Sequence, residues 1–201
     1  AGFPRPLVRK TMPSERFFKT DSVQDPHGTY LDIPRSASKP ASERAVEYLI
    51  ETYRNATQPI TLMPIGPLTN IAAAVAQEPK FAEWVPELII MGGGHEVPNM
   101  TASAEFNIWA DPEAASVVFN YGGPLKMVGL NTTHQVVITK GFVERVAALK
   151  TRKAIFAAEL LDFFSTTYGE QLGVYGGPLH DPCAVFAVTH PQLFDLRPKR
   201  V

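Results

Sequence analysis

A dense cluster of polar side chains follows closely after three glycines, Gly92-Gly93-Gly94, in this sequence. The nine residues from 99 to 107 contain Asn99, Glu105 and Asn107. Because amides donate and accept hydrogen bonds and a carboxylate accepts two, this set suits a polyhydroxylated ligand such as a sugar. The glycines let backbone and ligand approach closely. The alternative, favoured equally by composition, is an exposed loop in which these side chains only form turns and caps.

A second cluster is His180-Asp181-Pro182. His180 is a candidate general acid, because the ordinary pKa of imidazole, about 6.5, lets it give up a proton near neutral pH. Asp181 is a candidate ligand for a hard cation, although one carboxylate falls short of the roughly 6–8 oxygens of a calcium site. The structural alternatives are a helix N-cap for Asp181 and a non-catalytic role for His180.

Two tyrosines, Tyr168 and Tyr175, precede that histidine. Either could stack on a flat base or relay a proton to a leaving group, and the alternative is partial burial with a satisfied hydroxyl. The remaining histidines have no spacing typical of a metal site. The triple glycine is not a dinucleotide fingerprint, and no phosphate-binding loop with Lys-Ser/Thr is present.

The elements that must position these residues alternate between strands and helices. Apolar segments at 60–64, 87–91 and 125–130 predict strands, and helices are expected at 41–55 with Ser42 as N-cap, 71–77, 111–120, 140–149, 151–167 and 181–188. This alternation predicts an α/β fold with an open, mainly parallel sheet covered by helices on both faces. The polar segments 66–70, 92–107 and 131–134 each follow a predicted strand, so we expect them to converge at one sheet edge.

Length and composition restrict the class of protein. The 201 residues suit a single domain, with 1–40 a loop or flap and 41–201 the α/β core. A net charge of -1 argues against nucleic acid or an acidic membrane as partner. The lone cysteine, Cys183, and the lack of a signal peptide indicate a reducing compartment, the cytoplasm. The first and last residues lead us to expect a fragment of a longer chain.

Four motifs occur along the sequence: Gly66-Pro67-Leu68-Thr69-Asn70, Met91-Gly92-Gly93-Gly94, the run from Asn99 to Ala115, and Leu179-His180-Asp181-Pro182. Their order and distances are typical of the inosine-uridine-preferring nucleoside hydrolases, a family that this sequence resembles from Arg5 onward. A fifth segment, 129–134, is similar too, although the family usually has Asp where this chain has Asn131.

The resemblance implies hydrolysis of the N-glycosidic bond of ribonucleosides, with one Ca²⁺ bound and a dimer or tetramer as the assembly. It implies that Asn99, Glu105, Asn107 and Met91 hold the ribose. It further implies that the Asp181 side chain and the Ile65 carbonyl ligate calcium, and that His180 and Tyr168 assist the departing base. These roles fit the chemistry, because positive charge develops on the sugar and negative charge on the base in an oxocarbenium-like transition state.

One departure from the family stands out. In the family, an Asp-x-Asp-x-Gly-x-Asp-Asp motif supplies most calcium ligands and the carboxylate that activates the water. This motif is absent here, and Asp21, Asp25 and Asp32 do not replace it. The C-terminal strands of the family are absent too. The alternative hypothesis is therefore a non-catalytic homologue or fragment that binds ribosides or acts as a structural partner. A glycosidase for another sugar conjugate is a third hypothesis.

Overall fold

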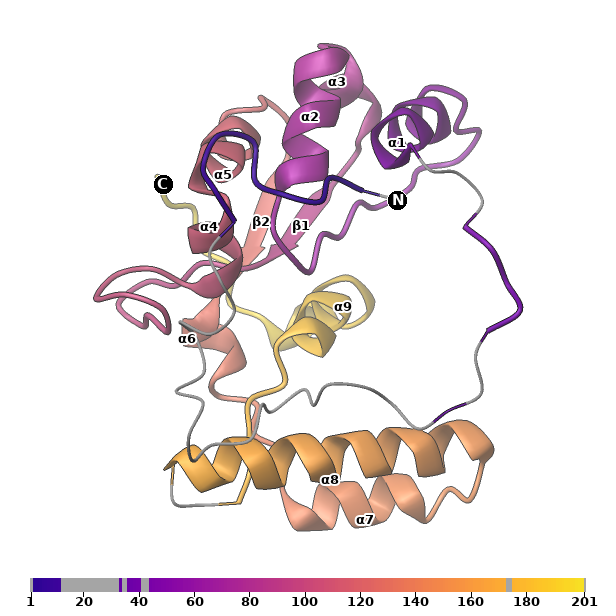
Figure 1. Cartoon of the computed structure of the whole chain (residues 1–201), viewed down its shortest axis with the longest axis vertical. Helices are drawn as coiled ribbons and strands as arrows, with labels where there is room; N and C mark the ends of the chain where they lie inside the picture. Colours follow the sequence, from indigo (N-terminus) through magenta and orange to yellow (C-terminus); the bar gives the residue numbers. More distant parts are fainter. Residues whose placement is uncertain (1, 12–32, 34–35, 41–43, 173–174, 201) are drawn as a thin grey trace. The chain divides into compact units, whose positions relative to one another are not determined.

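The computed structural model describes residues 2–11, 33, 36–40, 44–172 and 175–200 (Figure 1). Contacts divide the chain into two compact units. The first unit consists of Ala1–Thr11, Ser38–Thr133 and His180–Val201, and the second is built around His134–Leu179. Ser42, expected as an N-cap, and most of the expected flap lie outside the described residues.

The first unit is organised around two parallel strands, β1 (Leu88–Met91) and β2 (Leu125–Val128). Leu88 is in register with Leu125, and Met91 with Val128. The segment 60–64, which we expected to be a strand, forms only an isolated parallel bridge between Leu62 and Leu88. The prediction of a full strand there is therefore wrong. The backbone of this segment still pairs with β1, since Leu62 N–H donates to the Glu87 carbonyl and Ile89 N–H to the Leu62 carbonyl, both at 2.9 Å.

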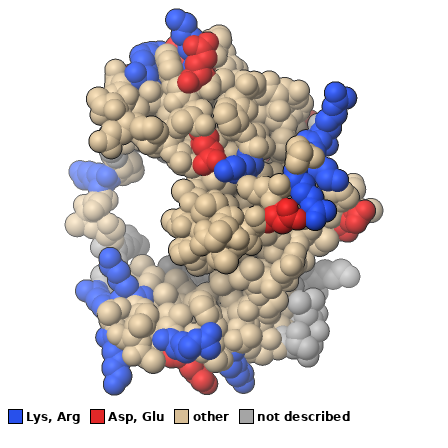
Figure 2. Space-filling model, turned by 180° about the vertical axis from the view of Figure 1, so that it is seen from behind, with Lys and Arg blue, Asp and Glu red and all other residues tan. Residues whose placement is uncertain are grey.

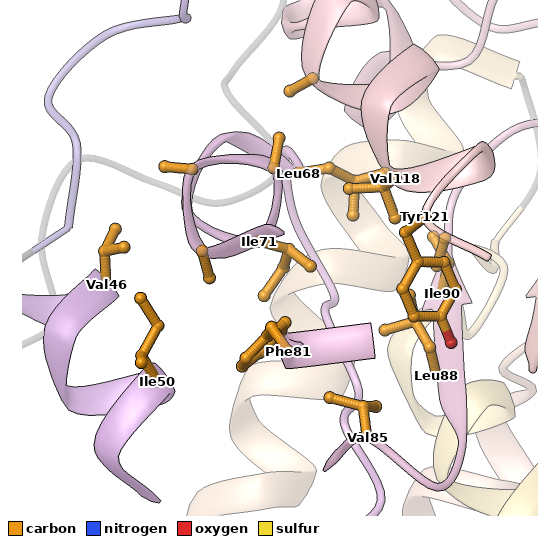
Figure 3. Packing of buried hydrophobic residues seen from close by; sticks show 14 of the residues in the cluster. Val46, Ile50, Leu68, Ile71, Phe81, Val85, Leu88, Ile90, Val118 and Tyr121 are labelled. Carbon is orange, nitrogen blue, oxygen red and sulfur yellow. The ribbon is translucent and has the colours of Figure 1, made fainter. Parts of the chain in front are cut away.

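Helices cover both faces of β1, as the sequence predicted. Successive side chains of a strand point to opposite faces, and all four residues of β1 are buried. Leu88 and Ile90 belong to one apolar cluster with Val118 and Tyr121 (Figure 3). Ile89 and Met91 belong to a second cluster. The first cluster contains residues of α1 (Ala45–Arg54), α2 (Thr69–Gln77), α3 (Phe81–Trp84) and α5 (Pro112–Phe119), and the second contains residues of α9 (Asp181–Thr189).

Local sequence explains where several helices begin and what they bury. In α1, Val46, Ile50 and Tyr53 recur at helical spacing and are buried. Helix α5 begins with Pro112, which needs no N–H partner there, and the Asp111 side chain caps it by accepting from Ala114 N–H at 3.0 Å. The expected strand at 125–130 ends two residues earlier, because Leu130 already begins α6 (Leu130–Thr133).

Residues 2–11 lie against the helices of the first unit. Phe3 N–H donates to Asn70 Oδ1 at 2.9 Å, and Leu7 N–H donates to Asp111 Oδ2 at 2.8 Å. Arg9 makes a two-pronged contact with the Glu113 carboxylate, at 2.9 and 2.6 Å. This part of the expected loop is therefore anchored to α2 and α5.

The second unit is mainly helical. Helices α7 (Lys140–Ala147) and α8 (Arg152–Leu172) pack against each other, and α8 extends five residues past the expected end at 167. An antiparallel bridge joins Val137 to Pro178. None of the described helices is long and apolar enough to cross a membrane. On the face seen in Figure 2, basic side chains are scattered in small groups, several beside acidic ones.

Candidate active site

The carboxyl ends of the pairing segments bring the predicted polar loops of the first unit together. Met91 N–H donates to the Pro64 carbonyl at 3.0 Å, which places Ile65 just beyond the end of β1. Leu130 N–H donates to the Gly93 carbonyl at 2.9 Å, so the loops after β1 and β2 lie side by side. The expected convergence of 92–107 and 131–134 is confirmed by these contacts.

Glu105 is the most enclosed of the candidate ribose ligands, with 4% of the residue exposed. It caps α4 (Phe106–Ala110), because Oε2 accepts from the N–H groups of Asn107 at 2.9 Å and Ile108 at 3.2 Å. The same oxygen accepts from Gly93 N–H at 2.8 Å. Oε1 accepts no hydrogen bond from a described residue, so one carboxylate oxygen is held in place while the other remains available to a ligand.

Asn107 lies beside Met91, as the hypothesis of a ribose pocket requires. Its Nδ2 donates to the Met91 carbonyl at 3.1 Å and lies 3.5 Å from Met91 Sδ. Asn107 and Met91 are both buried. This hydrogen bond to the last residue of β1 fixes the plane of the amide and therefore the direction of its acceptor, Oδ1.

The glycines after β1 are required by close packing. A Cβ on Gly92 would lie 3.3 Å from both Asn107 Cβ and Glu105 Oε2. Gly93 has φ of 72°, a left-handed conformation that side chains disfavour. A Cβ on Gly94 would collide with the Val97 carbonyl oxygen. The triple glycine thus lets Glu105 and Asn107 approach the strand end.

Asn99 differs from these two residues because it is exposed. Its backbone N–H donates to the Ala104 carbonyl at 3.1 Å, which closes the loop 99–104. The same carbonyl accepts from Met100 N–H at 2.9 Å. Asn99 therefore belongs to a tight exposed turn at the edge of the candidate site.

His180 and Asp181 stand at the start of α9. His180 occupies the N-cap position and Asp181 is the first helical residue, which corrects the alternative in which Asp181 is the cap. Both residues are half-buried. His180 Nδ1 lies 2.8 Å from the hydroxyl oxygen of Thr133, the last residue of α6.

Tyr168 belongs to α8 in the second unit. Its ring lies 5.4 Å from that of Phe164, and burial raises the pKa of its hydroxyl. The hydroxyl is therefore a donor at neutral pH. Tyr175, the other candidate, donates to Asp162 Oδ1 at 2.9 Å in the same unit.

The described residues do not by themselves fit a calcium ion. They contain no group of three or more His, Cys, Asp or Glu side chains that could hold a metal. Asp181 contributes a carboxylate, and Ile65, which is half-exposed, contributes a backbone carbonyl. These two fall well short of the roughly 6–8 oxygens that Ca²⁺ takes.

Thr133 was not singled out by the sequence. It lies between two polar neighbours in a run of threonines, and its partner His180 is 47 positions further along the chain. The one available signal is its place in the segment that follows β2. The hydrogen bond from Gly93 N–H to Glu105 was likewise not predicted, because a backbone donor cannot be recognised from the type of residue.

Comparisons with known proteins identify the family of this chain. The model of the family described as inosine-uridine preferring nucleoside hydrolase matches residues 1–201, and the chain belongs to that family. A pyrimidine-specific ribonucleoside hydrolase RihA from Shewanella sp. (strain ANA-3) is 38% identical over 195 residues, which cover 96% of this chain and 60% of the relative. The RihA of Salmonella paratyphi A is 36% identical over 194 residues, with 96% and 61% covered.

Solved structures of nucleoside hydrolases share the fold. The plant nucleoside hydrolase PpNRh1 has a TM-score of 0.78 at 34% identity, covering 88% of this chain and 57% of its own. The purine-preferring ribonucleoside hydrolase from Gardnerella vaginalis has a TM-score of 0.83 at 29% identity, with 96% and 62% covered. The chain thus has the α/β fold of these enzymes and spans about 60% of the length of the curated relatives it matches.

Proposed function

We propose that the whole protein hydrolyses the N-glycosidic bond of ribonucleosides to ribose and free base. The observation that carries this proposal is the arrangement of two buried side chains at the carboxyl end of β1, Asn107 bonded to Met91 and Glu105 bonded to Gly93. Each keeps a side-chain acceptor oxygen for a sugar hydroxyl while its remaining polar atoms are fixed by the backbone. Family membership supports the same reaction.

In this proposal the ribose is held by Glu105, Asn107, Asn99 and Met91. The first two accept hydrogen bonds from hydroxyls, Asn99 closes the exposed side and Met91 packs against the sugar. Positive charge grows on the ribose as the glycosidic bond breaks, and the Glu105 carboxylate stabilises it electrostatically.

The departing base takes up the electron pair of the broken bond and needs a hydrogen-bond donor or a proton. We assign that role to His180, with the Tyr168 hydroxyl in the same task. The assignment of His180 is based on its position at the start of α9, in the same unit as the proposed ribose-binding residues. The raised pKa of Tyr168 keeps its proton available.

Calcium is the metal that we propose for the whole protein, on the family resemblance. Asp181 would ligate by its side chain and Ile65 by its carbonyl, and further oxygens must come from other residues of the whole protein. Calorimetric titration of the whole protein with Ca²⁺, repeated on its Asp181→Asn variant, tests the assignment. Binding that is unchanged by the substitution would remove Asp181 from the site.

The remaining expectations concern the setting of the enzyme. We propose a cytoplasmic, homo-oligomeric enzyme, a dimer or tetramer, that works in nucleoside salvage on a small-molecule substrate. Light scattering of the whole protein measures the assembly, and a monomer at micromolar concentration would contradict it. Fractionation of the source cells measures the compartment.

Ribose release from inosine, guanosine, uridine and cytidine, with calcium, tests the reaction. We expect Asn107→Ala in the active protein to lower kcat/KM by about 10- to 100-fold, since it removes a fixed hydrogen bond to the sugar. The matched control is Asn120→Ala, which removes an exposed amide whose one hydrogen-bond partner among the described residues is the Ser116 carbonyl, and it should leave kcat/KM unchanged.

Two forms of the protein separate the hypotheses. This chain and a version extended upstream of Ala1 are assayed together. Turnover by the extended form supports hydrolysis by the whole protein. If the extended form is inert on every riboside while ribose binds calorimetrically, the non-catalytic homologue is correct instead.

A further inference from the structure

The hydroxyl of Thr133 and the imidazole of His180 form a close pair within the first unit. Oγ1 lies 2.8 Å from Nδ1. Thr133 ends α6, directly after β2, whereas His180 begins α9. The threonine is fully buried, at 0% exposure, so solvent does not compete for its hydroxyl.

The polarity of this hydrogen bond follows from the surroundings of the threonine. Thr133 N–H already donates to the Gly129 carbonyl at 3.1 Å. Among the described residues, Nδ1 of His180 is the one partner of the hydroxyl oxygen. Because a buried hydroxyl proton without an acceptor is more costly than an unused lone pair, this environment favours the hydroxyl as donor and Nδ1 as acceptor.

A neutral imidazole that accepts at Nδ1 carries its proton on Nε2. We propose that Thr133 is a positioning residue that holds His180 in the Nε2–H tautomer and fixes the plane of its ring. This inference rests on the proposed function, because the Nε2–H group is then the donor that hydrogen-bonds the departing base. Thr133 itself does not touch the substrate.

Two substitutions separate this role from simple packing. Thr133→Val has nearly the same shape and removes the hydroxyl, whereas Thr133→Ser keeps the hydroxyl and removes the methyl group. A packing role predicts that Ser is the more disruptive change, since it leaves a small cavity. The positioning role predicts that Ser behaves as the unsubstituted protein and Val does not.

Nitrogen-15 spectra of the histidine side chains report the tautomer directly and need no turnover. They are recorded at about pH 8.5, above the ordinary imidazole pKa, with His180→Gln to assign the signals. We expect an unprotonated Nδ1 and a protonated Nε2 in the unsubstituted protein and in Thr133→Ser. Thr133→Val should show the averaged shifts of two tautomers. A protonated Nδ1 in the unsubstituted protein, or a Val spectrum identical to it, would overturn the inference.

Kinetics of the active whole protein test the consequence for catalysis. Thr133→Val should lower kcat by roughly 10-fold with little change in KM, because the imidazole is then no longer held with Nε2–H toward the departing base, and Thr133→Ser should restore it. With a nitrophenyl riboside, whose leaving group needs no donor, the loss should vanish. An equal loss on both substrates would contradict the positioning role. If no form hydrolyses ribosides, the proposed function fails while the spectra still decide the tautomer.

Discussion

Glu105 Oε2 accepts a hydrogen bond from Gly93 N–H at 2.8 Å, which ties the first turn of α4 to the residue that follows β1 by two positions. The same oxygen caps α4 through two further N–H groups. A residue that the sequence marks as a sugar ligand is therefore also the residue that holds its own loop in place.

Replacing Glu105 by Gln should destabilise the protein by about 2 kcal/mol, because hydrogen bonds to a carboxylate are stronger than those to an amide and the cap is weakened. Chemical unfolding of both proteins measures the difference. Riboside affinity should fall in the same variant. The matched control is Glu51→Gln, an exposed glutamate of α1 with no ion pair to a described residue, and unfolding unchanged in both variants would contradict the dual role.

Asp111 and Thr69 form a buried hydrogen bond at 2.7 Å that joins α2 to the cap of α5. A double-mutant cycle of Thr69→Val and Asp111→Ala should give a coupling energy of about 1 kcal/mol or more. Asp111→Ala alone should cost about 3 kcal/mol, since it removes the cap and the acceptor of Leu7 N–H.

The control for that cycle is Thr52→Val, whose hydroxyl bonds to the Tyr48 carbonyl within α1 at an exposed position. It should change the free energy of unfolding by less than about 0.5 kcal/mol. Additive effects of the two core substitutions would show that the Asp111–Thr69 bond contributes little.

Gly94→Ala should destabilise the fold by about 2 kcal/mol, because the new Cβ meets the Val97 carbonyl, a backbone atom that cannot move away cheaply. Gly66→Ala is the matched control, since nothing lies within 4 Å of its Cβ position. We expect thermal unfolding to separate the two variants clearly. Equal melting temperatures would mean that the loop after β1 adapts.

The pair between Arg9 and Glu113 should make stability depend on acid pH. The hydrogen bond from Arg9 lowers the pKa of Glu113 below its ordinary value of 4.5. A lowered pKa stabilises the folded state at pH values above 4.5, and this contribution is lost as pH falls through the folded pKa. The melting temperature of Glu113→Gln should therefore lie below that of the unsubstituted protein at pH 6 and approach it near pH 3.

Amide exchange at Leu7 gives a second measure of the same pair. Exchange should speed up in Glu113→Gln, because Arg9 no longer anchors residues 2–11. Raising the ionic strength at pH 6 should narrow the difference, since both side chains are partly exposed and screened by salt. A difference that persists at pH 3 would show that the pair does not cause it.

Several elements could be predicted from local pattern alone. The apolar run of β1, the stripe of α1 and the Asp111-Pro112 start of α5 all depend on neighbours within a few residues, and the structure confirms them. The segment 60–64 was predicted as a strand from the same kind of pattern. It forms a single bridge because strand length depends on partners that lie elsewhere in the chain.

By itself the sequence determined the family, through motifs whose residue types and order are specific, and the α/β class, through alternating apolar segments. Only the tertiary structure decided that Glu105 is a cap as well as a candidate ligand, and that Thr133 faces His180. The physical reason is that propensity and periodicity act over neighbouring residues. These two contacts instead join residues that are 12 and 47 positions apart in the sequence, so they exist only once the chain has folded.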